Sequence, residues 1–373
     1  CGEIVQRTLV LQESMAAQIH PIAFLPASVL GDFRVQRLQE ADRAARAVSP
    51  EIVQTSVTYL DRDQHVTIVN SEGLFTSDRR VYTRLIVRAV ASDGKENQTG
   101  TMTPGAMRGA ELFDTIDAAE VGRRAAIQAQ TMLHAPVCPA GIMPVVIGNG
   151  FGGVIFHEAC GHSLEATSVA RNQSEFCGKL GQQVASPIVT AIDDGTMPNE
   201  WGSSNLDDEG MPTSRLVLIE KGILRNYMID RLNGRRMQMA PTGSARRQSY
   251  AFAPTSRMRN TFIAPGTDDD EEMIRTMGDG LYAAAMGGGS VNPTTGEFNF
   301  AVLEGYLVHD GRIQTPVRGA SLIGRGSEIL LKIDRVGCDM KMAQGMCGSL
   351  SGSVPTNVGQ PRIRVQSMTV GGR

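Results

Sequence analysis

The sequence has few aromatic residues, few cysteines and no long apolar run. Aromatic side chains account for 5% of its 373 residues, and its six cysteines form no Cys-x-x-Cys pair. Cysteines this sparse exclude a disulfide-rich scaffold and fit reduced thiols in a cytoplasm. No stretch approaches the roughly 18 apolar residues that a membrane span needs, and the first residues have no export signal. We therefore expect a cytoplasmic protein without a membrane partner.

The chain also lacks an excess of positive charge. It carries 36 Lys and Arg against 39 Asp and Glu, which gives a formal net charge of -3. Since a phosphate backbone attracts basic surfaces, this balance argues against a nucleic acid as the partner. The length of the chain fits about two domains of roughly 150 residues each. Because the sequence begins with Cys1 instead of Met, we expect a processed or incomplete amino terminus.

Patterns in the first 140 residues predict two helices and an antiparallel meander. Apolar residues at helical spacing predict a helix over residues 33–48. Asp117 and Glu120 form a capping-box pattern, which predicts a second helix that reaches about His134. Between them, β-branched runs predict strands over 53–59, 66–69 and 81–90, with turns at 61–63 and 70–73.

Beyond a proline-rich boundary near residue 140, the sequence predicts mostly hairpins. The expected elements are a strand over 143–148, hairpin turns at 221–222 and 310–311, and one helix over 269–286. We therefore expect an α+β fold with mostly antiparallel sheets and a few helices. An α+β domain (1–140) would precede a β-rich domain (141–373), with a metal-site helix at the start of the latter.

One segment is chemically distinctive, the run His157-Glu158-Ala159-Cys160-Gly161-His162. It resembles the H-E-x-x-H zinc signature, in which two histidines share a helix face and the glutamate is the base. Here the histidines are five residues apart, so a regular helix at ~100° per residue would separate them by about 140°. A π-type turn would return them to one face, and Gly161 would let the backbone take that distortion. The pattern favours a metal site that still needs a third ligand.

The other candidate ligands have simpler interpretations. His20, His65 and His134 lack metal-type neighbours, and His309 sits beside a hairpin turn. All four are interpreted as ordinary core or surface histidines. Cysteines expected to pack as small apolar residues are Cys138, Cys160 and Cys177.

Charged residues elsewhere could also bind ligands. A hard cation could bind Asp193, Asp194, Asp207, Asp208 and Glu209, although acidic turn capping is the favoured interpretation. Arg246 and Arg247 have no accompanying basic run, so we interpret them as solvated or as contacts for a substrate carboxylate.

Further motifs follow the histidine run in order along the chain. They are Asp193 to Met197, Asp207 to Gly210, Pro241 to Gly243, Arg246 to Tyr250, Met286 to Gly289, Gly319 to Gly326, Met346 to Gly348, Val358 to Pro361 and Met368 to Gly372. Together with His157 to His162, they resemble the TldD/PmbA metallopeptidases, also called modulators of DNA gyrase. The resemblance covers residues 142–372 and, more loosely, about 5–140. It implies that the family's first strand–helix segment is missing.

The resemblance implies zinc (Zn²⁺) bound by His157, His162 and a cysteine near the carboxyl end, Cys347. A His₂Cys set leaves a fourth tetrahedral position for water, as a catalytic zinc requires. Zinc would acidify that water and polarise the scissile carbonyl, and Glu158 would accept the proton and pass it to the leaving amine. The implied activity is hydrolysis of peptide bonds in unfolded peptides or leader segments, held by strand addition in a β-lined cleft.

Cys338, nine residues before Cys347, is the competing cysteine. Asp334 and Asp339 lie close to Cys338 in sequence, and negative neighbours disfavour the thiolate that a metal needs. Cys347 lies on a glycine-bounded segment without an adjacent carboxylate, which favours it as the ligand. Without the resemblance, an ordinary buried Cys347 would be an equal alternative.

Family members commonly pair with a homologous subunit that lacks the metal motif. Since this chain has the motif, the resemblance implies the TldD-type half of a heterodimer with a TldE/PmbA-type subunit.

Two other hypotheses for the function stay open. The first is a regulatory or binding protein with a structural metal, which the intact Glu158 argues against. The second is another His₂Cys hydrolase, such as a deformylase-like amidase, which shares the site chemistry but not the surrounding motifs.

Overall fold

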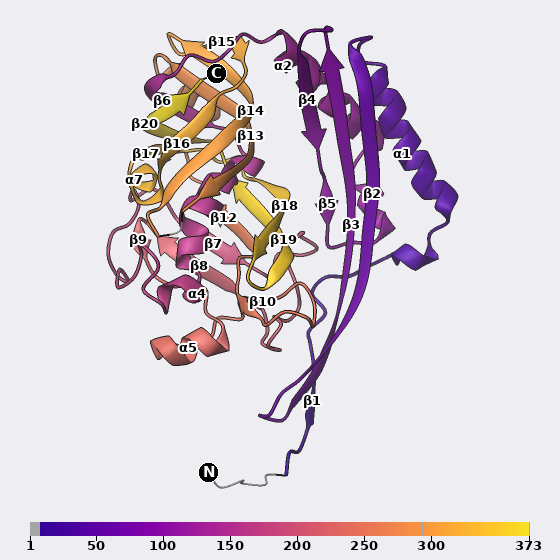
Figure 1. Ribbon diagram of the computed structural model, residues 1–373. Coiled ribbons are helices and arrows are strands. Elements are labelled where there is room, and N and C mark those ends of the chain that lie inside the picture. Colours follow the sequence, from indigo (N-terminus) through magenta and orange to yellow (C-terminus); the bar gives the residue numbers. More distant parts are fainter. Residues whose placement is uncertain (1–7, 293, 373) are drawn as a thin grey trace.

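The computed structural model describes residues 8–292 and 294–372, and a long hairpin runs along one side of the molecule (Figure 1). Its strands, β2 (Ile52–Val69) and β3 (Leu74–Ser92), pair antiparallel over their whole length. The predicted turn at 70–73 is confirmed, because the Asn70 side chain accepts hydrogen bonds from the amides of Glu72 and Leu74.

The predicted turn at 61–63 is wrong, because β2 continues through these polar residues. β2 is the last strand of its sheet, so polar side chains can point to solvent without ending the strand. Asp63 Oδ2 lies 2.7 Å from Arg79 Nη2 of β3, and Asp61 Oδ2 lies 3.5 Å from Arg34 Nη2. These ion pairs stabilise the charges that suggested a turn.

Two helices cover one face of this sheet. The predicted helices are confirmed as α1 (Gly31–Arg46) and α2 (Ala118–His134). The Asp117 carboxylate caps α2 by accepting a hydrogen bond from the Ala119 amide at 2.9 Å. Leu85 and Val87 of β3 belong to the core beneath the helices. The remaining elements of this part are β1 (Gln12–Met15), η1 (Pro26–Ser28), β4 (Asn97–Met102), β5 (Gly105–Ala106) and η2 (Ala110–Asp114).

The rest of the chain forms two larger sheets, so the α+β fold is as predicted. In one of them five strands close into a ring in the order β13–β6–β20–β16–β14, because β13 pairs with both β6 and β14. The strands of this sheet are β6 (Gly141–Ile147), β13 (Gly280–Val291), β14 (Glu297–His309), β15 (Arg312–Val317), β16 (Ser321–Arg325), β17 (Ile333–Val336) and β20 (Ile363–Gly371).

The second large sheet has the order β18–β19–β12–β7–β8–β9. Its strands are β7 (Ala191–Asp194), β8 (Arg215–Glu220), β9 (Ile223–Leu224), β12 (Asn260–Ile263), β18 (Lys341–Ser349) and β19 (Gly352–Gln360). A small pair, β10 (Ala245–Arg246) and β11 (Thr255–Ser256), lies apart from it. Both predicted hairpin turns, at 221–222 and 310–311, are confirmed.

The predicted helix over residues 269–286 is correct only at its start. Helix α6 (Asp270–Arg275) is capped by the Asp269 carboxylate, but it ends at Arg275. Gly278 then takes a φ of 74°, and β13 begins at Gly280. Leu281 is fully buried in the ring. Packing inside a closed sheet therefore overrides the local helical pattern.

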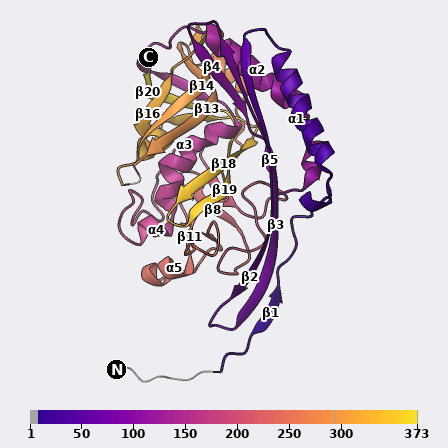
Figure 2. The same cartoon turned by 45° about the vertical axis from the view of Figure 1, so that its right-hand side comes forward.

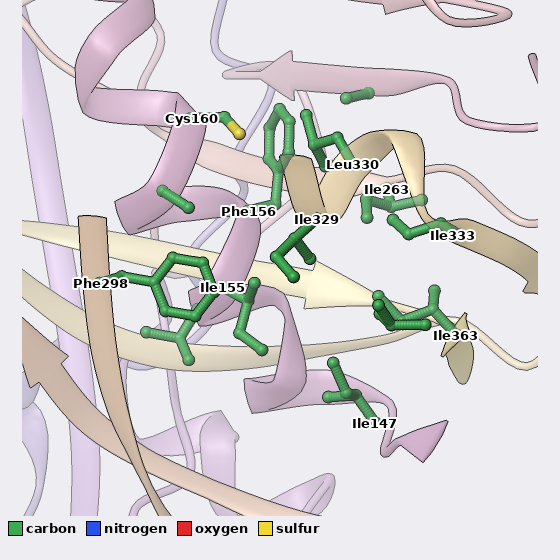
Figure 3. Packing of buried hydrophobic residues seen from close by; sticks show 14 of the residues in the cluster. Ile147, Ile155, Phe156, Cys160, Ile263, Phe298, Ile329, Leu330, Ile333 and Ile363 are labelled. Carbon is green, nitrogen blue, oxygen red and sulfur yellow. The ribbon is translucent and has the colours of Figure 1, made fainter. Parts of the chain in front are cut away.

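Short helical turns lie between the closed ring and the six-stranded sheet (Figure 2). This helical run comprises η3 (Gly150–Gly153), α3 (Val154–Phe156), η4 (His157–Gly161), η5 (His162–Leu164) and α4 (Ala166–Val169). Ile155 and Phe156 pack in a hydrophobic core with Phe298 (Figure 3). On its other side, a Cβ atom at Gly153 would lie 2.6 Å from the Gly359 backbone. Hydrophobic packing on one side and close contact with the Gly359 backbone on the other hold these helical turns in place.

The other helices are α5 (Arg231–Met237) and α7 (Gly326–Leu331). Across residues 8–292 and 294–372, no helix is both long enough and apolar enough to cross a membrane.

Buried polar contacts join the hairpin sheet to the second part of the chain. Arg80 Nη1 of β3 lies 2.8 Å from Asp208 Oδ1. Arg84 Nη2 donates a hydrogen bond to the Gln344 carbonyl at 2.8 Å, and the Arg84 guanidinium stacks over the Trp201 ring. Since Gln344 belongs to β18, the hairpin sheet is bonded directly to that strand.

Candidate metal centre

The two motif histidines lie on one face of the helical run. Residues His157–Gly161 form a π turn, in which the His162 amide donates to the His157 carbonyl. The two imidazole ring centroids are 5.0 Å apart, with their planes at 83°. The π-type turn expected from the five-residue spacing is therefore confirmed, and it brings the two side chains together.

Gly161 has a different role from the one expected. Its φ of -56° and ψ of -51° are ordinary right-handed helical values, so the turn needs no special backbone freedom there. Space is the constraint instead, because a Cβ atom at Gly161 would lie 2.1 Å from the Met258 sulfur. Met258 is itself fully buried. The glycine allows this close packing against the helical run.

The third side chain comes from β18. Cys347 pairs with Val354 in the β18–β19 hairpin, and its Sγ atom lies 3.3 Å from His162 Nε2. One ligand atom from each of His157, His162 and Cys347 lies within 4.8 Å of the others. His157 and Cys347 are buried, and the buried His157 Nδ1 atom has no hydrogen-bond partner within residues 8–292 and 294–372. The structure thus brings together the three side chains singled out as ligands.

The charges in this group favour a thiolate. Burial by itself would raise the pKa of the Cys347 thiol, but the charge of His157 and hydrogen bonds with His157 and His162 lower this pKa to about 3. Burial would also lower the pKa of His162, yet the charge of Glu165 and contacts with Cys347 raise it well above its usual value. A thiolate beside imidazoles is a donor set that suits zinc.

Glu158 lies at the solvent side of this group. Its Oε2 atom is 3.7 Å from His162 Nε2, and 26% of its side chain is exposed. The carboxylate therefore has access both to solvent and to the nitrogen that faces Cys347. This is the placement that a proton acceptor at the centre would need.

Two residues near the centre received no role from the sequence. Glu165 Oε2 lies 3.3 Å from His162 Nδ1, and Arg257 lies between Glu165 and the Cys347 carbonyl. The three-residue separation of His162 and Glu165 on a helical run could have indicated the first contact. No local pattern indicates Arg257, because its partners are remote in sequence.

The other cysteines lie in ordinary surroundings. Cys160 is buried in the hydrophobic cluster that includes Phe156 and Leu330, so it packs as predicted (Figure 3). Cys138 is buried, Cys177 is half-buried and Cys338 is exposed. Among the described residues, none of these thiols joins a group of potential metal ligands.

The remaining histidines contact protein groups. His20 Nδ1 accepts a hydrogen bond from the Asn199 amide, and His134 Nε2 lies 3.0 Å from Glu51. His65 is exposed near Asp63. His309 lies beside Asp279 and Asp310 in a second group of potential ligands, all of them exposed.

The acidic residues satisfy backbone and arginine donors. Asp207 accepts hydrogen bonds from the amides of Glu209, Met211 and Ala245, and Asp193 accepts one from the Arg259 amide. Asp207 therefore caps a turn, whereas Asp193 lies within β7 and bonds across the sheet. The interpretation of Arg246 as solvated is wrong. Its guanidinium is buried and donates to the Met258 carbonyl at 2.6 Å, and burial lowers its pKa to about 10.

Comparison with known proteins gives two family matches and close relatives. Residues 140–372 match the PmbA/TldA metallopeptidase C-terminal domain, and residues 24–133 match the PmbA/TldA metallopeptidase central domain. A metalloprotease TldD homolog of Haemophilus influenzae is 38% identical, over 95% of this chain and 76% of that protein. A zinc metalloprotease TldD homolog of Saccharolobus solfataricus is 29% identical, over 91% of this chain and 76% of that protein.

Two crystal structures share the fold. A modulator of a DNA gyrase from Thermotoga maritima matches with a TM-score of 0.80 and 22% identity, over 99% of this chain and 81% of that one. TldE from Thermococcus kodakarensis matches with a TM-score of 0.74 and 19% identity, over 92% of this chain and 75% of that one. At these identities the likeness concerns the fold alone.

We expect Gly161→Ala to destabilise the protein, because the new methyl group would meet the buried Met258 sulfur. Overpacking of this kind costs about 1–3 kcal/mol, more than the ~1 kcal/mol by which alanine favours a helix over glycine. Urea unfolding of the metal-free protein measures the change. Gly348→Ala is the matched control, since a Cβ atom there would have no neighbour within 4 Å in the described part of the chain. Equal stability of the two variants would show that close packing is not what requires Gly161.

Proposed function

The chain belongs to the PmbA/TldD family of metallopeptidases, and on that premise we propose that it hydrolyses peptide bonds with a zinc ion held by His157, His162 and Cys347. The observation that carries this proposal is the convergence of two imidazoles and one thiol from separate elements. The acidic thiol of Cys347 and the unpartnered, buried His157 Nδ1 both suit a metal ion. Three protein ligands leave one position open, as in catalytic zinc sites.

Glu158 is proposed as the general base. Zinc in such a site acidifies water and polarises the scissile carbonyl. The Glu158 carboxylate, 3.7 Å from His162 Nε2 and partly exposed, is placed to accept the proton of the attacking water. It can then deliver that proton to the amine of the leaving peptide. A purely structural metal is less well supported, since a structural site has no use for an accessible carboxylate beside its ligands.

The substrate is proposed to be an unfolded peptide or a leader segment in extended form. A cleft of about 810 Å³ is lined by residues of α2 and β4 on one side and of β13 and β18 on the other. β4 and β18 are both edge strands, and β18 carries Cys347. Edge strands can bind an extended chain by strand addition. Arg84 and Trp201 already donate to the Gln344 and Gly345 carbonyls, so such pairing would use only part of β18.

We further propose a cytoplasmic heterodimer. The described cysteines are all free thiols, which suits a reducing compartment. A homologous TldE/PmbA-type subunit is the expected partner because the family resemblance implies it, and TldE from Thermococcus kodakarensis has the same fold. We also propose that the chain consists of two domains, an α+β domain (1–140) and a β-rich metallopeptidase domain (141–373).

Glu158→Gln should leave zinc bound but reduce peptide hydrolysis ~100-fold to ~10,000-fold, because the ligands stay while the base becomes a neutral amide. Incubation of the zinc-loaded protein, alone and with a homologue that lacks the motif, with an unfolded protein and short peptides measures the activity, and the products are read by mass spectrometry. Metal analysis measures the zinc. Glu271→Gln, an exposed change on α6, is the control. Wild-type turnover in a zinc-replete Glu158→Gln protein would reject the mechanism.

Cys347→Ser should sharply lower zinc content and activity while the chain stays folded, since a serine hydroxyl is a poor zinc ligand. Cys338→Ser removes an exposed thiol and should leave both nearly unchanged. Metal analysis and circular dichroism of the two variants distinguish loss of the ligand from loss of the fold. The reverse order of zinc contents would overturn the choice of cysteine.

The chain alone should hydrolyse peptides poorly, and co-expression with a homologue that lacks the motif should raise its activity. The reason is the pairing that the family resemblance implies. Size-exclusion chromatography with a peptide assay on each fraction tests this. Full activity in a monodisperse monomer would remove the heterodimer from the proposal.

A further inference from the structure

Arg257 is a fully buried arginine that contacts both structural elements of the candidate metal centre. It follows β11, and its guanidinium lies between the helical run with the histidines and the β18–β19 hairpin with Cys347. We propose that Arg257 and Glu165 form a positioning pair that fixes His162 and Cys347 relative to each other for zinc. This inference rests on the proposed function and adds two residues that do not themselves bind the metal.

On the helical side, the pair acts through the His162 ring. Glu165 Oε2 lies 3.3 Å from His162 Nδ1, and Glu165 Oε1 lies 3.8 Å from Arg257 Nε. A carboxylate next to Nδ1 keeps the proton on that nitrogen and leaves the Nε2 lone pair for a metal. The Nε2 atom is the one that faces Cys347 Sγ at 3.3 Å.

On the hairpin side, Arg257 binds the backbone around Cys347. Its Nη2 atom donates to the Cys347 carbonyl. Its Nη1 atom donates to Ser351 Oγ at 2.9 Å and to the Gly352 carbonyl at 2.9 Å. Because the guanidinium is a rigid planar fork, these bonds set the hairpin at one orientation to Glu165.

The burial of this charge supports a geometric role. Among the described residues, neither Glu165 Oε1 nor Arg257 Nε has a hydrogen-bond partner. These two atoms instead face each other as an ion pair at 3.8 Å. A buried ion pair is often no more stabilising than apolar side chains of similar volume. Apolar side chains could not form directional bonds to the helical run and to the β18–β19 hairpin, whereas Arg257 and Glu165 form such bonds.

Arg259 provides a matched comparison two residues away. It is also buried, with 1% exposure against 0% for Arg257. Its guanidinium donates to Ser204 Oγ and to the Gly243 carbonyl, and none of its hydrogen bonds involves His157, His162 or Cys347. A change at Arg259 therefore removes a similar buried arginine without touching the centre.

The test compares Glu165→Gln, Arg257→Lys and Arg259→Lys in the full chain. The zinc dissociation constant is measured by competition with a chromophoric chelator, and the ligand geometry by the visible spectrum of the Co²⁺-loaded protein. We expect Glu165→Gln and Arg257→Lys to weaken zinc binding about 10-fold to 100-fold and to shift the Co²⁺ bands. Arg259→Lys should lower thermal stability while its zinc affinity and Co²⁺ spectrum stay those of the wild type.

Zinc affinity and Co²⁺ spectra unchanged in both Glu165→Gln and Arg257→Lys would overturn the inference, as would an equal loss in Arg259→Lys. If Arg257→Lys does not fold, Glu165→Gln decides, because it keeps the shape of the side chain while a neutral amide replaces the carboxylate. Absence of zinc binding by the wild-type chain would instead reject the proposed function itself.

Discussion

Two histidines five residues apart can face one ion only if the helix between them widens by one residue, and the surrounding structure holds that wide turn in place. Glycines make this possible at three points. Gly153 lies against the Gly359 backbone, Gly161 against the Met258 sulfur, and Gly326 against the Ala159 carbonyl, where a Cβ atom would lie 2.3 Å away. A π turn is rare as an isolated structure. Here the surrounding structure packs closely against the π turn on several sides. A residue larger than glycine at any of these three positions would prevent that packing.

Several charged arginine side chains are buried around this turn, in places where a protein core is normally apolar. Arg257 and Arg259 are among the largest fully buried side chains, and Arg80 and Arg84 connect the hairpin sheet to the second part of the chain. Arginine bonds are directional, so each fixes an orientation as well as a distance. Apolar packing elsewhere supplies the stability, and these polar bonds supply the alignment of β18, β3 and the helical run.

Local patterns predicted local structure well. The Asp117 cap and the π turn follow from residues close together in sequence, and both are as expected. The sequence-based predictions were wrong where residues distant in sequence determine the local structure. The segment after Arg275 becomes a strand because β6 and β14 pair with it, and Arg246 is buried by contacts with Met258 and Thr356. Spacing alone also could not select Cys347, which lies 185 residues from His162. The family resemblance supplied that choice.

That separation has a consequence during synthesis of the chain. The segment with both histidines leaves the ribosome first, and the 185 residues up to Cys347 take roughly 10 to 40 s to add at typical translation rates. Even then β18 needs its partner β19, which ends at Gln360. A growing chain therefore offers at most two of the three proposed donors until β18 and β19 have been made. A peptidase built in this order has no finished centre while its own chain, up to Gln360, is still emerging from the ribosome.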